Sequence, residues 1–150
     1  VRTMAFALQP NYSWTDQTAT VGGGPKPSRA YTFGLQLLPC SGSGCDASLH
    51  SISLLADESA CRGTEMSLAV MRPDGTTVYR QPLWETGTGI LKFSRLSIEM
   101  EQVSGTQLEL QLPRTGPCST LEVLMGGQAL VYSLSESSYQ YCPSSCVSLS

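Results

Sequence analysis

Six cysteines are the strongest constraint on how this 150-residue chain can fold. Four of them stand in two close pairs, with C-x4-C and C-x3-C spacing. In a chain of this length, such cysteines indicate three disulfides formed in an oxidising compartment, with the pairing open. Zinc is the alternative, but both spacings are loose for a structural zinc site, and the only histidine, His50, lies in a strand-like alternation. We therefore expect disulfides and no metal at Cys40, Cys45, Cys61, Cys118, Cys142 and Cys146.

Hydrophobic and polar residues alternate in several short runs, which is the period of a half-buried strand. Pro73-Asp74-Gly75 has the composition of a tight turn between two such runs, 66–71 and 76–80. Scattered apolar residues over 90–103 add further strand character. The pattern predicts an all-β fold, a disulfide-stapled antiparallel β-sandwich. Its clearest strands are expected at residues 31–37, 49–55, 108–112 and 130–134.

One short helix is expected near Ser119–Met125. Ser119 is followed three residues later by Glu122, the pattern of a capping box in which both side chains bond free amides of the first turn. Gly126 and Gly127 are expected to end the helix.

The first 30 residues carry a weaker signal. A first strand is expected over residues 2–9, followed by a mobile loop or linker over 16–30, where glycine and proline cluster. The sequence thus divides into 1–30, an N-terminal strand and flexible loop, and 31–150, the β domain. The start at Val1 without a basic and apolar leader indicates a mature or excised piece.

The residues offer no catalytic constellation. His50 is the one imidazole, and among so many serines a neighbouring hydroxyl is expected by chance. Glu99 and Glu101 would share one face of a strand, where the interpretation is a charged solvent-facing edge. Asp57 and Glu58 are too few oxygen ligands for calcium. We expect no enzyme activity and no cofactor, and a net charge of −3 excludes a strong nucleic-acid footprint. No run reaches the ~20 apolar residues of a membrane span.

Aromatic residues are the better candidates for a binding site, because exposed rings can stack on the apolar faces of sugars. The residues singled out for a carbohydrate contact are Tyr79, Trp84, Tyr139 and Tyr141. Core or rim packing is the alternative for each. Asn11, in Asn11-Tyr12-Ser13, is the only asparagine and lies in an N-glycosylation acceptor sequence.

The order of motifs resembles the pherophorin domain of volvocine green algae over residues 31–146. The matching pieces are Cys45-Asp46 with Leu49 and Ile52, then Ala60-Cys61-Arg62-Gly63, and the C-terminal run from Cys118 through Tyr132-Ser133-Leu134 to Cys142-Pro143. Met125 and Leu130 stand where family members tend to carry cysteines. The resemblance implies that cysteines at these two positions form a disulfide with each other in other family members. This chain would then have replaced that pair of cysteines with apolar residues.

The resemblance implies a structural or interaction module of an extracellular matrix, cell wall or cell-surface glycoprotein assembly. Its expected partners are other matrix or surface glycoproteins and polysaccharide, outside the cell, with the oligomeric state open. The alternative is a lectin-like adhesion domain with one defined carbohydrate or partner site, for example at a flagellar or gamete surface.

Overall fold

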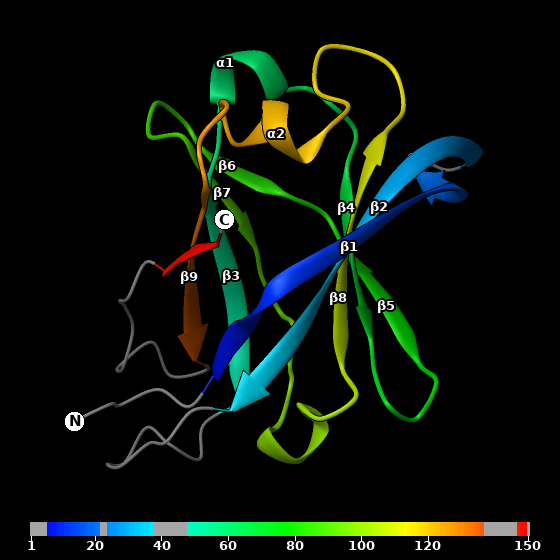
Figure 1. Cartoon of the computed structure of the whole chain (residues 1–150), viewed down its shortest axis with the longest axis vertical. Helices are drawn as coiled ribbons and strands as arrows, with labels where there is room; N and C mark the ends of the chain where they lie inside the picture. Colours follow the sequence, from blue (N-terminus) through cyan, green and yellow to red (C-terminus); the bar gives the residue numbers. More distant parts are fainter. Residues whose placement is uncertain (1–5, 22–23, 38–47, 137–146, 150) are drawn as a thin grey trace.

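The computed structural model describes residues 6–21, 24–37, 48–136 and 147–149, which form two five-stranded sheets packed face to face (Figure 1). The order is β1-β2-β8-β4-β5 in the first sheet and β10-β9-β3-β7-β6 in the second, with every pair antiparallel. The predicted all-β sandwich is confirmed. The strands are β1 (Phe6–Val21), β2 (Gly24–Leu37), β3 (Leu49–Leu55), β4 (Ser67–Met71), β5 (Thr77–Arg80), β6 (Leu83–Glu85), β7 (Ile90–Phe93), β8 (Gln107–Pro113), β9 (Leu130–Glu136) and β10 (Val147–Leu149).

The core is built from the alternating residues that the sequence marks. In the first sheet, Tyr31, Leu110 and Leu68 pair in one buried row across β2, β8 and β4. In the second, Tyr132, Leu54 and Leu91 form the matching row across β9, β3 and β7. Along β3 and β8, these buried residues alternate with less buried ones, because successive side chains of a strand point to opposite faces.

The loop predicted over residues 16–30 is wrong, because β1 and β2, the two longest strands, run through most of it. Residues 16–21 belong to β1 and 24–30 to β2, and the two strands pair in register from Tyr12↔Phe33 to Val21↔Gly24. The ribbon crosses the front of the molecule in Figure 1. Residues 16–21 and 24–30 are poor in large apolar side chains, so backbone pairing, and not local hydrophobic periodicity, makes them strands. Leu37, expected on the buried face, ends β2 at 46% exposure.

Two short helices lie together at one end of the sandwich: α1 (Glu58–Cys61) and α2 (Leu121–Leu124). Only α2 is expected from the sequence. Its cap differs from the prediction, because Thr120 is the N-cap, with its Oγ1 accepting a hydrogen bond from Val123 N at 3.2 Å. Ser119 lies one residue before this N-cap, so the capping box expected from Ser119 and Glu122 does not form.

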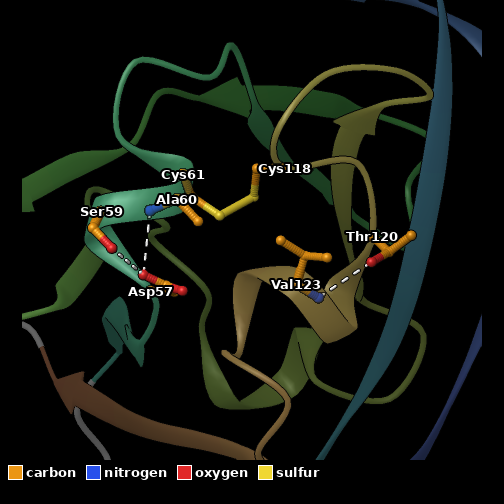
Figure 2. Close-up of a disulfide and its surroundings, with 7 residues drawn as sticks. All are labelled: Asp57, Ser59, Ala60, Cys61, Cys118, Thr120 and Val123. Atoms are coloured by element: carbon orange, nitrogen blue, oxygen red, sulfur yellow. Dashed lines mark hydrogen bonds between the residues drawn. A yellow bond between two sulfur atoms is a disulfide. The ribbon is translucent and has the colours of Figure 1, made fainter.

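A disulfide joins Cys61, at the end of α1, to Cys118, just before α2 (Figure 2). Both cysteines are fully buried, and their Cα atoms lie 5.0 Å apart. The bond therefore ties together two segments separated by 57 positions in the sequence. Cys40, Cys45, Cys142 and Cys146 lie outside the described residues.

The turn predicted between residues 66–71 and 76–80 is confirmed, and the strand predicted around Glu99 and Glu101 is not. Pro73-Asp74-Gly75 turns between β4 and β5 as predicted, with Gly75 at φ +89° and Asp74 Oδ1 accepting a hydrogen bond from Thr76 N at 2.9 Å. A 3₁₀ helix, η1 (Met100–Gln102), occupies the segment where a strand was expected to carry Glu99 and Glu101. The prediction that Glu99 and Glu101 share one face of a strand is therefore wrong. The chain turns into a 3₁₀ helix there, and Glu99 N donates a hydrogen bond to Gln102 Oε1 at 3.0 Å.

Candidate functional site

The structure separates the aromatic residues singled out in the sequence. Tyr79 lies on β5, at the edge of the first sheet, and is 53% exposed. Trp84 lies on β6, at the edge of the second sheet, and is partly buried against the core. The two residues thus belong to different sheets and form no common platform. Tyr139 and Tyr141 lie outside the described residues.

A different pair of aromatic rings is brought to the surface by β1. Tyr12 and Trp14 are two apart on one face of the strand, opposite Phe33 and Tyr31 of β2. Their ring centroids lie 5.3 Å apart for Tyr12–Phe33 and 6.4 Å apart for Trp14–Tyr31. Both rings therefore continue the core face of the first sheet outward.

The core face emerges from the sandwich along β1. Leu8 is 3% exposed, and its backbone N donates a hydrogen bond to Tyr132 Oη of the second sheet at 3.0 Å. An irregularity between Leu8 and Tyr12 then inserts extra residues into β1, so that Leu8 pairs with Leu35 and Tyr12 with Phe33. Beyond it, exposure rises to 40% at Tyr12 and 57% at Trp14. The second sheet thus covers the beginning of this face and leaves the rest open.

Charged side chains continue the same face. Arg29 pairs with Asp16 across β1 and β2, its Nε 2.9 Å from Asp16 Oδ1, and its Cζ lies 5.0 Å from the centroid of the Trp14 ring. Arg114, just after β8, brings its Nε to 3.8 Å from the same Asp16 oxygen. We call Tyr12, Trp14, Asp16, Arg29 and Arg114 the Trp14 strip.

The contacts within the strip fix its geometry. Arg114 donates from Nη2 to Gln17 O at 3.0 Å and from Nε to Ser28 O at 3.1 Å, so it bridges β1 and β2. The hydrogen bond to Asp16 raises the pKa of Arg29, and its guanidinium, charged like any arginine, lies beside the indole. A cation over the face of a tryptophan ring holds that ring in place. The strip thus presents a flat apolar ring flanked by two cations and one carboxylate.

The strip was missed from the sequence for a definite reason. Tyr12, Trp14 and Asp16 alternate with Ser13 and Thr15, which is a strand signal. The predicted loop over residues 16–30 hid it, and Arg114 is far away in the sequence. The alternation alone could have found the two aromatic residues, but not their charged neighbours.

Asp57 and Glu58, the acidic pair considered as calcium ligands, form hydrogen bonds within the protein. Asp57 Oδ1 caps α1 by accepting hydrogen bonds from Ala60 N at 3.2 Å and Ser59 Oγ at 2.9 Å (Figure 2). Glu58 accepts from the backbone N of Gly87 and Gly89 and from Arg62, and the two glycine amides, with Arg62, lower the pKa of its carboxyl group. These oxygens already have protein donors.

Other candidates contribute less. His50 is half-buried in β3, and its backbone O accepts a hydrogen bond from Leu96 N. Among the described residues, no three possible ligands lie together in a way that could hold a metal ion. Asn11 lies within β1, but its side chain is outside the described part. No described helix is long and apolar enough to cross a membrane.

A hollow of about 370 Å³ adjoins the Arg114 end of the strip. Arg114 N donates a hydrogen bond to Pro27 O at 3.4 Å. This pocket is lined by Pro27 and by Pro113, the residue before Arg114. Its remaining lining comes from the loop after α1 and the segment before Cys118 (Arg62, Gly63, Thr64, Glu65, Thr115 and Pro117).

Comparison with known proteins agrees with the motif order. Searches of the curated proteins and of the solved structures gave no significant match. A family model described as Pherophorin matches residues 1–143, which is nearly the whole chain. The match includes both strands of the ribbon that carries Tyr12, Trp14 and Arg29. The chain therefore belongs to the pherophorin family.

Proposed function

We propose that this domain is a non-catalytic interaction module of an extracellular matrix, cell wall or cell-surface glycoprotein assembly. Family membership suggests an extracellular matrix glycoprotein domain. The buried Cys61–Cys118 disulfide is consistent with secretion, because such bonds persist in oxidising compartments. The observation that carries the interaction role is the Trp14 strip, where an indole stays 57% exposed on a paired, hydrogen-bonded ribbon.

The strip supports an interaction role on physical grounds. Exposing a large aromatic ring gives up the hydrophobic stabilisation that its burial would contribute. In the strip, the ring is instead held by Arg29 and flanked by Asp16, so its place on the surface is specified by neighbouring contacts. Tryptophan, tyrosine and arginine are also enriched among the residues that carry most of the energy of binding interfaces.

A binding experiment tests this function. The purified domain is incubated with an insoluble matrix fraction from a volvocine alga, and the bound fraction is measured against protein concentration. We expect W14A to bind less than the wild type, and Y79A to bind like it. Tyr79 is the matched control because it is aromatic, exposed to a similar extent and on the opposite edge of the same sheet. Equal binding by W14A and the wild type, or no binding by any form, would contradict the proposal.

Secretion and glycosylation belong to the same proposal. The intact mass of the secreted protein should rise by six hydrogens on reduction, one for each cysteine, and fall when N-glycans are removed from Asn11. Free thiols without a glycan would remove the extracellular setting.

The second candidate function is a lectin-like adhesion domain, and the flat exposed face of Trp14 favours it. The two functions differ in whether one defined site saturates. A glycan screen with a saturable response that depends on Trp14 would favour the adhesion domain over a general assembly role.

A further inference from the structure

We infer that the Trp14 strip binds pyranose rings that carry a carboxylate, as in a uronic-acid polysaccharide. The inference rests on the proposed function and names the chemistry of its ligand. It follows from two features of the strip: an open aromatic face and an excess of positive charge beside that face.

The aromatic face suits a sugar ring. One side of the indole of Trp14 is occupied by the guanidinium of Arg29, and more than half of the residue remains exposed. Tyr12 lies two positions away on the same strand face and is 40% exposed. Rings in this arrangement offer a flat apolar surface with polar groups at its rim, which matches the apolar face and hydroxyl edge of a pyranose.

The charge around the ring selects among sugars. Arg29 and Arg114 both approach a single carboxylate, Asp16, at 2.9 and 3.8 Å, which leaves one positive charge in excess on a chain whose net charge is −3. Within the described part of the chain, Arg114 donates hydrogen bonds from Nε and Nη2 to backbone carbonyls. A guanidinium carries five N–H donors, so these two bonds do not use all of them. Arginine binds carboxylates in a planar, charge-assisted geometry. A carboxylate on a sugar stacked at Trp14 would therefore find Arg114 as its partner.

Other ligands fit less well. A cationic amino sugar would meet two guanidinium groups, and a neutral sugar would use the ring but leave the excess charge unpaired. Beside Arg114, Pro27 and Pro113 line a pocket of about 370 Å³. A second copy of this chain, pairing through the edge strand β1, is the main competing occupant.

Isothermal titration calorimetry with two oligosaccharides that differ only in charge tests the inference. The probes are a short oligogalacturonate and its carboxyl-reduced form, which has the same rings and linkages without the charge. We expect the wild type to bind the acidic oligomer at least about tenfold more tightly at low salt, with the difference shrinking as ionic strength rises. W14A should weaken binding of the acidic oligomer about tenfold, W14F should restore most of it, and Y79A should bind like the wild type. R114Q should remove the preference for the acidic form, and circular dichroism checks that each variant is folded.

Each other outcome overturns the inference. Equal binding of both oligomers shows a neutral-sugar site, and binding unaffected by W14A places the site elsewhere. Sedimentation that shows a dimer abolished by W14A, with neither oligomer bound, assigns the strip to a second copy. If matrix binding still depends on Trp14 while the acidic oligomer does not bind, the ligand is wrong and the proposed function stands. If both fail, the proposed function fails with it.

Discussion

Two neighbouring hydroxyl residues precede α2, and only the second of them caps it. Thr120 has extended backbone angles, φ −135° and ψ 156°, which bring its Oγ1 to the free amide of Val123. Ser119 is half-buried one position earlier. Because an N-cap must stand where the helical geometry begins, a shift of one residue decides which hydroxyl is used.

The first prediction concerns this cap. T120A should lower the free energy of unfolding by about 1 kcal/mol, because it leaves an amide of the first turn without its acceptor. S119A is the matched control and should change stability by less than about 0.5 kcal/mol. Urea denaturation measures both, with the same slope expected for each variant. A larger loss in S119A than in T120A would show that the helix begins at the earlier residue.

The second prediction concerns Glu58. Hydrogen bonds from the amides of Gly87 and Gly89, together with Arg62, lower the pKa of its carboxyl group below 4.5 in the folded state. A lowered folded pKa contributes stability that is fully present above the unfolded pKa and is lost as pH falls through the folded pKa. The stability difference between the wild type and E58Q should therefore be largest near neutral pH and shrink below pH ~4.5. A difference that stays constant from neutral to acid pH, in urea denaturation, would contradict the role of the charge.

At the scale of elements, the two short helices are stabilised more by the Cys61–Cys118 disulfide and their contacts with each other than by hydrogen bonds within each helix. Each helix has four residues, far below the ~12–15 that make an isolated helix stable in water. The Cys61–Cys118 bond and the hydrogen bond from Asp57 N to Leu124 O at 2.7 Å connect the two. The helical end of the sandwich is therefore held by tertiary links.

The third prediction removes that link. The double variant C61A/C118A should lose about 4 kcal/mol of stability, because the bond closes a loop of 57 residues in the unfolded chain. The measurement is chemical denaturation under non-reducing conditions. A loss below about 1 kcal/mol would show that packing alone holds this end together.

At the scale of the whole molecule, the N-terminal ribbon joins the two sheets. Phe6 and Leu8 are buried in the core, and the Leu8 N–Tyr132 Oη hydrogen bond crosses from one sheet to the other. The ribbon also supplies most of the Trp14 strip. Stability and binding thus share one element.

The fourth prediction tests whether the β domain needs this element. A chain beginning at Gly24 loses β1, with the buried Phe6, Ala7 and Leu8 and the hydrogen bond from Leu8 N to Tyr132 Oη. We expect it to lack a cooperative thermal transition, whereas a chain beginning at Phe6 should retain one. The boundary near residue 30 suggested by composition would be supported instead if the shorter chain unfolds cooperatively.

The sequence by itself determined the all-β class and several strands in detail. Leu49–Leu55 and the turn at Pro73-Asp74-Gly75 follow directly from residue type and spacing, because alternation and turn chemistry act over a few neighbouring positions. The order of cysteines and apolar runs was also enough to suggest the family. Met125 and Leu130 are both buried in the core.

Only the tertiary structure decided the rest. Residues 16–21 and 24–30 lack a hydrophobic signal and become strands through pairing with each other and with β8. The Trp14 strip needs Arg114, which lies 98 positions after Asp16 in the sequence and reaches it only when β8 pairs with β2. Local periodicity carries no information on which distant strands will be neighbours. The fold class was therefore accessible from the sequence, while the candidate binding surface emerged only when long-range pairing brought its residues together.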